Sequence, residues 1–228
     1  MRLPSFLVVA LALAAACKPT HTQTPHTAAS ADVEGKTVAL VTASNGIAKA
    51  YCSGVWVADD AFLTANHCLS DTVLGEPVAY VTRGDISAAD ADELAVLRIG
   101  KLVALDADHD LALVKVKFAP SHGTATLAPD DPETGQPVQT MGHPLGLWYS
   151  YSQGNVAAVR AMDLDDTGTA IWFVQSTAPI SPGNSGGGLF DTDGRLMGVC
   201  HAYFPRGENL NLYVHVKYVR MFLKGQGA

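Results

Sequence analysis

The sequence predicts an all-β fold, built as a sandwich or a barrel. From Lys36 onward the chain consists of short apolar segments rich in Val, Ile and Leu, which are bounded by Gly, Asp, Asn and Pro. Segments of this length and composition are typical of strands, and no long stretch of helical periodicity interrupts them, as a βαβ sheet would require. With 228 residues, of which 48% are hydrophobic and 16% charged, the chain has room for one large or two small domains.

The strand candidates form two groups, separated by a connection at 120–137 that contains four prolines and two glycines. A closing helix is expected at 218–224. The strands expected before the connection are 37–42, 50–58, 61–64, 78–82, 94–99, 102–105 and 111–118, and those expected after it are 138–141, 153–159, 170–175, 188–190, 196–202 and 212–216.

Residues 1–17 predict a signal peptide. Arg2 precedes an apolar run at 3–16 that is too short to span a bilayer comfortably. Three alanines before Cys17 resemble a bacterial lipoprotein signal, in which the cysteine is lipidated and becomes the first residue of the mature chain. Lys18 in second position favours the outer membrane. Ordinary cleavage, with release of a periplasmic or secreted protein, is the alternative.

Residues 18–35 are rich in Thr, Pro, Ala and His, with too few large apolar side chains to pack, and predict a disordered tether. His21 and His26 in this segment are not expected to bind a metal. The formal charge of −7 and the absence of any Lys/Arg run argue against nucleic acid as a partner.

The segment with the clearest chemistry is the glycine-rich stretch 181–190 around Ser185. Glycines allow a sharp turn, so that amide N–H groups converge beside the Ser185 hydroxyl. The amides of Gly183 and Ser185 would form an oxyanion hole, which stabilises the negative charge that develops on an attacked carbonyl oxygen. A simple turn between strands is the alternative interpretation.

A histidine and an acid lie upstream of this serine: His67 in the segment 64–68 and Asp110 in the segment 108–113. The order His, Asp, Ser differs from the order Ser, acid, His of α/β-hydrolases, although the glycine pattern around Ser185 also fits their nucleophile turn. The three segments together resemble the trypsin-like (chymotrypsin-fold) serine peptidases. They supply a nucleophile, a base and a carboxylate that fixes the imidazole tautomer.

Two stretches, at 178–187 and 141–147, are similar to the protease domain of bacterial Deg-type (high-temperature-requirement) enzymes. The resemblance covers about 37–223. A PDZ domain usually follows in those enzymes, and because the sequence ends at Ala228 we expect none here.

The resemblance implies two antiparallel six-stranded β-barrels with the active site between them and a short C-terminal helix. The N-terminal barrel, 36–122, would supply His67 and Asp110, and the C-terminal barrel, 123–228, would supply Ser185. The implied function is that of a serine endopeptidase with polypeptide substrates, without a cofactor or a metal. A catalytically silent binding module of the cell envelope is the alternative. The sequence does not predict the oligomeric state.

The resemblance also implies a disulfide between Cys52 and Cys68 across the histidine loop, which leaves Cys200 buried and reduced. A zinc site formed by these cysteines with His67 and His201 is a competing hypothesis. No C-x-x-C or H-x-x-x-H spacing supports it.

For the substrate pocket, the resemblance gives positions. Pro179 stands where enzymes that cut after Arg or Lys have an aspartate, and with Ile180 it would form an apolar floor that disfavours those cations. Cys200 and His201 would lie on the opposite wall, in a strand whose side chains alternate. We predict a small or medium aliphatic residue on the acyl side of the cut bond. A register shift of one residue would turn His201 inward and favour Glu.

Overall fold

The computed structural model describes residues 27–44, 47–86, 97–117, 123–164, 168–204 and 207–227. The predicted signal peptide, the lipidation of Cys17 and residues 18–26 of the predicted tether lie outside these ranges. Over the part of the chain that is described, no helix combines the length and the apolar character needed to cross a membrane.

Six strands form a closed antiparallel barrel in the order β1-β2-β3-β6-β5-β4. Edge-to-face contacts of Trp56 with Phe62 and Tyr80 fill its interior, where all three side chains are buried. The strands are β1 (Thr37–Ser44), β2 (Ile47–Ala58), β3 (Ala61–Ala65), β4 (Pro77–Thr82), β5 (Arg98–Asp106) and β6 (Leu111–Lys115).

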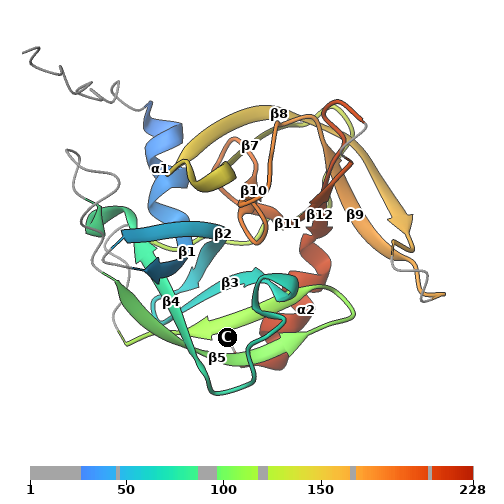
Figure 1. Ribbon diagram of the computed structural model, residues 1–228. Helices are drawn as coiled ribbons and strands as arrows, with labels where there is room; N and C mark the ends of the chain where they lie inside the picture. The colour runs from blue at the N-terminus through green and yellow to red at the C-terminus, as the bar shows by residue number, and fades with distance from the viewer. Residues whose placement is uncertain are drawn as a thin grey trace, which may run out of the picture.

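A second closed antiparallel barrel follows, in the order β10-β11-β12-β9-β8-β7. In Figure 1 its yellow-to-red strands lie above the blue-to-green strands of the first barrel. The prediction of two six-stranded barrels is confirmed. The strands are β7 (Pro137–Gly142), β8 (Ser150–Met162), β9 (Ile171–Ser176), β10 (Gly188–Phe190), β11 (Leu196–Tyr203) and β12 (Asn211–His215).

One strand prediction is wrong in the first barrel, because 94–99 and 102–105 are not separate strands. Residues Arg98–Asp106 form one strand, β5, and Gly100 pairs with Val78 in its interior. A Cβ at Gly100 would lie 2.5 Å from Cγ1 of Val114, so this glycine allows close packing inside the barrel and does not mark a turn.

The tether prediction is also wrong for residues 28–35, which belong to the helix α1 (Ala28–Lys36). The helix is held by tertiary contacts with both barrels. Glu34 forms an ion pair with Arg83 of the first barrel, and the Lys36 ammonium donates to the Gly194 carbonyl of the second at 2.9 Å. Val33, which precedes Glu34, is fully buried in the hydrophobic cluster that both barrels share. One large apolar residue is therefore enough to dock this helix, because the contacts of Glu34 and Lys36 with the two barrels add to its burial.

The hydrophobic core continues from one barrel into the other. One buried cluster contains Leu63 and Leu111 of the first barrel together with Met141, Phe190 and Val199 of the second. Residues carried by different barrels are thus held in a fixed relation to each other, which a site between them requires.

The C-terminal helix α2 (Val216–Gly225) confirms the predicted closing helix and packs on the second barrel through Val219 and Phe222. His215 caps it by accepting a hydrogen bond from the amide of Lys217. The Tyr218 ring stacks on His109 at a centroid distance of 4.0 Å. Through this contact the helix reaches the loop before β6, in which Asp110 lies.

Candidate active site

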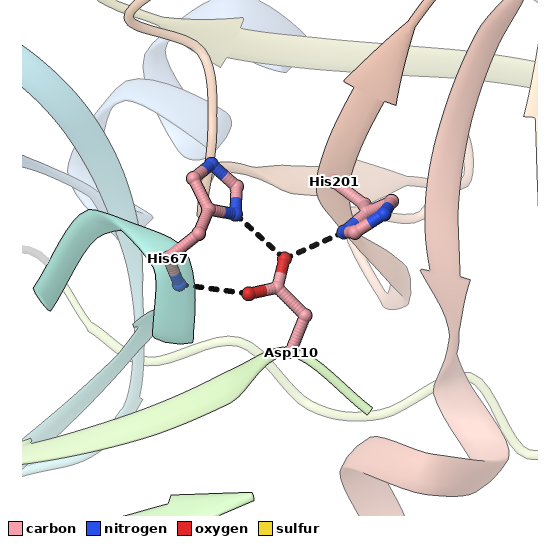
Figure 2. A group of neighbouring side chains, drawn as sticks. All are labelled: His67, Asp110 and His201. Carbon is pink, nitrogen blue, oxygen red and sulfur yellow. Dashed lines mark hydrogen bonds and ion pairs between the residues drawn. The ribbon is translucent and has the colours of Figure 1, made fainter. Parts of the chain in front are cut away.

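Asp110 lies at the centre of a hydrogen-bonded cluster between the barrels (Figure 2). Its Oδ1 accepts from the backbone N–H of His67 at 2.8 Å. Its Oδ2 lies 2.8 Å from Nδ1 of His67 and 2.6 Å from Nδ1 of His201. The carboxylate thus fixes two imidazoles that come from different barrels.

The electrostatics of this cluster follow from its hydrogen bonds. The hydrogen bond that His67 donates to Asp110 raises the pKa of His67 above its usual value of 6.5, against the opposing effect of burial. Burial by itself would raise the pKa of Asp110, but hydrogen bonds from His201 and His67 outweigh it and lower that pKa to about 2. Asp110 is therefore a carboxylate at any physiological pH.

Short local structures position these two side chains. His67 lies in η1 (Asn66–Leu69), a 3₁₀ helix that follows β3 directly. Asp110 precedes β6 and has φ 52°, a conformation that few residue types other than Gly and Asn/Asp adopt readily. The Asn66 N–H donates to the Asp110 carbonyl at 3.1 Å, which ties the two loops together. The neighbouring His109 points elsewhere and bonds Asp106 through Nδ1 at 2.8 Å.

The predicted disulfide between Cys52 and Cys68 is confirmed, and Cys200 is free and buried as expected. Because Cys68 follows His67 in η1, the disulfide anchors the histidine loop to β2. Ser53, next to Cys52, donates its backbone N–H to the Ser185 carbonyl at 2.8 Å. The segments that carry His67 and Ser185 are therefore fixed to the same strand.

The glycine-rich turn has the backbone geometry that a hydrogen-bonding cradle needs. Gly183 has φ 103° and Gly186 φ 83°, and a Cβ at either position would lie 2.3 Å from a backbone oxygen. The amides of Asn184, Gly186 and Gly187 donate within the fold, to carbonyls of Ser181, Cys200 and Asn184.

The amides of Gly183 and Ser185 differ from these neighbours. Within the described ranges, neither has a hydrogen-bond acceptor, although Gly183 is buried. Buried N–H groups are normally paired, which sets these two amides, on either side of Asn184, apart from their neighbours. These are the two amides that the sequence predicted as an oxyanion hole.

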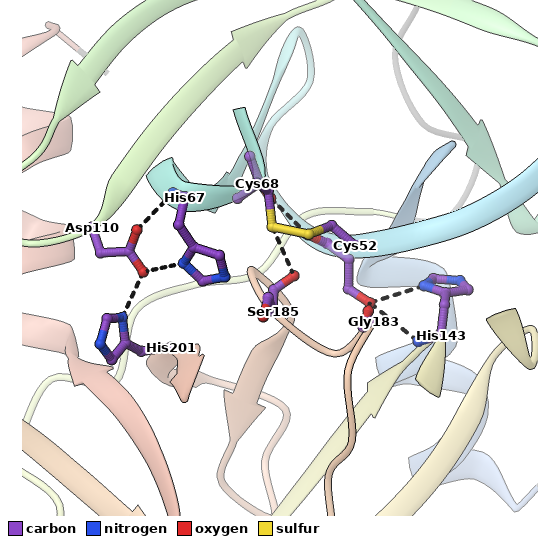
Figure 3. Close-up of a disulfide and its surroundings, with 10 residues drawn as sticks. Cys52, His67, Cys68, Asp110, His143, Gly183, Ser185 and His201 are labelled. Carbon is purple, nitrogen blue, oxygen red and sulfur yellow. Dashed lines mark hydrogen bonds and ion pairs between the residues drawn. A yellow bond between two sulfur atoms is a disulfide. The ribbon is translucent and has the colours of Figure 1, made fainter. Parts of the chain in front are cut away.

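Ser185 itself lies beside the His67 imidazole, and that ring lies between Asp110 and Ser185 in Figure 3. The Oγ of Ser185 has no hydrogen-bond partner among the described residues. Hydrogen bonds between nucleophile and base are often long in ligand-free enzymes and shorten when substrate binds.

A buried network under the turn was not predicted from the sequence. The Ser53 hydroxyl donates to the Gly183 carbonyl at 2.7 Å and accepts from the backbone N–H of His143 at 3.1 Å. Nδ1 of His143 lies 3.0 Å from the same hydroxyl (Figure 3). His143 is completely buried, which lowers its pKa to about 3, so the imidazole is neutral. The only signal in the sequence was the stretch 141–147, which resembled the Deg-type enzymes without suggesting a role.

A hollow of about 250 Å³ adjoins Ser185 and is lined by Ile180, Cys200, His201 and Ala202 among others. The structure does not place Pro179 in it. Pro179 is exposed, and its carbonyl accepts a hydrogen bond from the Ser152 hydroxyl at 2.7 Å.

His201 has a contact that the sequence did not predict, because it was assigned only to the pocket wall. Its Nδ1 bonds Asp110, and its ring stacks on Phe173 at 5.2 Å. Simple alternation along β11 could not have suggested this, because the register with β12 shifts between Cys200 and Ala202 and leaves His201 without a partner there. Among the described residues, His67, Asp110 and His201 also form the group whose ligand atoms are close enough for a metal ion. The disulfide excludes Cys52 and Cys68 from the competing zinc hypothesis.

Comparisons with known proteins agree with this geometry. Residues 52–199 match the family described as Trypsin-like peptidase domain. A probable periplasmic serine endoprotease, DegP-like, of Halomonas elongata is 33% identical over 162 residues, which are 68% of this chain and 30% of the relative. An HtrA-like serine protease of Staphylococcus epidermidis is 29% identical over 188 residues, with 72% and 32% coverage. The chain thus spans about a third of the length of these curated relatives.

Solved structures show the same fold. The crystal structure of the serine endoprotease from Yersinia pestis superposes with a TM-score of 0.68 at 23% identity and covers 89% of this chain and 67% of that one. At this identity the likeness concerns the fold alone. The match over 52–199, with the paired barrels and the cluster between them, establishes that the chain belongs to the trypsin-like peptidase family.

Proposed function

We propose that this chain is a serine endopeptidase in which His67, Asp110 and Ser185 act together on a peptide carbonyl. One observation carries the proposal: the imidazole of His67, bonded to Asp110 through Nδ1 at 2.8 Å, lies between that carboxylate and Ser185. This is the relation that a base needs to accept a proton from a serine hydroxyl.

The mechanism follows from the tautomer. Asp110 is ionised and accepts from Nδ1–H of His67, so the lone pair of Nε2 is available on the side of Ser185. Nε2 takes the Ser185 proton as Oγ attacks the carbonyl carbon, and the imidazolium then protonates the leaving amine. Water hydrolyses the resulting acyl-enzyme by the same route. The raised pKa of His67 favours proton acceptance in both steps.

The amides of Gly183 and Ser185 would bind the oxyanion that forms in each step. Both lack an acceptor among the described residues, and donors fixed before the reaction need no reorganisation. Losing one such donor typically reduces kcat by about 10² to 10³.

For the substrate, we propose polypeptides with a small or medium aliphatic residue on the acyl side of the cut bond. The hollow beside Ser185 is lined by Ile180, Cys200 and Ala202 and is of modest volume. His201 is engaged with Asp110, which weakens the alternative of a Glu-accepting pocket. A peptide library analysed by mass spectrometry tests this specificity. Dominant cleavage after Arg or Lys would contradict the apolar pocket, and dominant cleavage after Glu would restore the role of His201.

We further propose that the enzyme acts outside the cytoplasm, in the bacterial cell envelope. The disulfide is of a kind that persists in oxidising compartments, and the relative from Halomonas elongata is named as periplasmic. A lipid anchor at Cys17 would hold the chain at the outer membrane. Cys17→Ser should then move the protein from the membrane fraction to the soluble one, and unchanged fractionation would favour ordinary cleavage.

A fluorophosphonate probe provides the main test, because it reacts only with an activated serine. Folded wild-type protein should be labelled at Ser185, and Ser185→Ala should abolish labelling and reduce kcat by roughly 10⁴ to 10⁶. Ser70→Ala, which removes an exposed serine near η1, is the matched control and should behave as wild type. Folded wild type that resists labelling would favour the silent binding module.

A further inference from the structure

Three side chains that can ligate a metal, those of His67, Asp110 and His201, lie next to one another between the barrels. Nδ1 of His67 and Nδ1 of His201 both contact Oδ2 of Asp110, at 2.8 and 2.6 Å, and the three ligand atoms lie within 4.8 Å of one another. We propose that this cluster binds a divalent cation of the zinc class, and that the bound cation switches the peptidase off. The binding part stands on the geometry alone, whereas the inhibitory part rests on the proposed function.

The donor set determines the class of cation. Two imidazoles and one carboxylate suit Zn²⁺ and its neighbours in the first transition series, whereas Mg²⁺ and Ca²⁺ prefer sites built from oxygen ligands. In a tetrahedral site with bonds of about 2.0–2.1 Å the ligand atoms are about 3.3 Å apart. The contacts of 2.8 and 2.6 Å must therefore open by about 0.5 and 0.7 Å to reach this spacing, and the ligand nitrogens of the two imidazoles already lie within 4.8 Å of each other.

The ligands are already oriented by other contacts. Stacking on Phe173 fixes the ring of His201, and the His67 backbone amide holds Oδ1 of Asp110, so that Oδ2 can pivot toward a cation. Supporting contacts of this kind raise metal affinity because they orient the ligands before binding.

A cavity of about 310 Å³, lined by Asp110 and His201, provides access and space for a water as fourth ligand. Asp110, His201 and Phe173 line it, together with the carboxylates of Asp108 and Asp163, which favour entry of a cation. A cation can therefore reach the cluster without passing through the hollow beside Ser185.

Binding would stop catalysis through the tautomer of His67. A metal bond at Nδ1 uses the lone pair there, so the neutral ring carries its proton on Nε2. Nε2 then faces Ser185 as a donor and has no lone pair to accept the hydroxyl proton. The cation also takes Oδ2 of Asp110 away from its role as hydrogen-bond acceptor.

Direct binding is measured by calorimetry with Zn²⁺ on the Ser185→Ala protein, which prevents self-digestion and makes the readout independent of activity. The protein carries no histidine tag, and His21 and His26 are replaced by Ala. We expect one Zn²⁺ per chain and no heat from Mg²⁺. His201→Ser, which removes one imidazole ligand, should bind Zn²⁺ at least tenfold more weakly, and circular dichroism verifies its fold. His109→Gln, which removes a histidine from the rim of the same cavity, should bind as the parent does.

Activity gives the second readout. Zn²⁺ should inhibit peptide cleavage by the chain with intact Ser185, and a chelator should restore it. His201→Ser, compared with its own activity without metal, should need at least tenfold more Zn²⁺. Failure to bind one Zn²⁺, or equal affinity in the parent and His201→Ser, would overturn the site. Binding that depends on His201 in a chain without peptidase activity would retain the site and reject the proposed function.

Discussion

The His67 side and the His143 side of the site each hold a histidine through Nδ1, yet they give it opposite properties. His67 is bonded to the carboxylate of Asp110 at 2.8 Å, its side chain is 45% exposed, and its pKa is raised. His143 is bonded to the hydroxyl of Ser53 at 3.0 Å, is completely buried, and has a pKa lowered to about 3.

The difference fits the role that we propose for each side. An imidazole that takes up a proton needs a negative partner, which Asp110 supplies. An imidazole that supports a backbone loop must stay neutral, and burial against a hydroxyl ensures this for His143. The disulfide links the two sides, because Cys52 precedes Ser53 and Cys68 follows His67.

The largest expected effect comes from removing the charge on the His67 side. Asp110→Asn should reduce kcat by about 10⁴, the loss seen when this acid is neutralised in such triads. Loss of the carboxylate lowers the pKa of His67, so the rising limb of the profile of kcat/KM against pH should move to lower pH. In wild type the midpoint of that limb should lie above pH 6.5, because the pKa of His67 is raised from that value.

Asp108→Asn provides the control. This exposed carboxylate lies two residues before Asp110 in the sequence, and among the described residues the carboxylate bonded to His67 is that of Asp110. It should leave both kcat and the position of the limb close to wild type. An Asp110→Asn variant with an unshifted limb would show that the carboxylate does not set the pKa of His67.

Breaking the covalent link between the two sides should have the next largest effect. Replacing Cys52 and Cys68 together by Ala should lower the free energy of unfolding by about 3 kcal/mol, the loop-closure contribution for a loop of this length. Urea denaturation measures it, and wild type treated with a reductant is the parallel sample. If the double variant were as stable as wild type, the link would not constrain the unfolded chain.

On the His143 side, Ser53→Ala should leave the Gly183 carbonyl and Nδ1 of His143 without their partner. A buried polar group left unpaired costs about 1–3 kcal/mol. We expect a destabilisation of that size and a fall of kcat by about tenfold with little change in KM, because the turn with the oxyanion amides loses its support. Ser152→Ala removes an exposed hydrogen bond to Pro179 and should change neither quantity. A normal kcat in a destabilised Ser53→Ala would restrict this network to a structural role.

The last prediction alters neither histidine and concerns only the pH at which each of them titrates. Histidine resonances of the Ser185→Ala protein, followed by NMR through the acid range, should show His67 titrating above its usual value of 6.5. His143 should show no titration until the pH approaches about 3. Titration of His143 near 6 would indicate that its burial or its neutral contacts are not as described.

The sequence by itself determined what local chemistry and chain order encode. The glycines around Ser185 allow a sharp turn, and the order of His67, Asp110 and Ser185 selected the fold among serine hydrolases. Strand-length apolar segments predicted most strands correctly, because burial in a barrel imposes their length and composition.

Only the tertiary structure decided which distant groups meet. His201 bonds Asp110 across 91 residues of sequence, and Ser53 bonds Gly183 across 130 residues. Such contacts depend on strand register and on how one barrel packs against the other, so no local pattern reveals them. The docking of α1 likewise depends on Glu34 and Lys36, which bind partners on separate barrels. The composition of this segment predicted a disordered tether, because it does not reveal such distant partners.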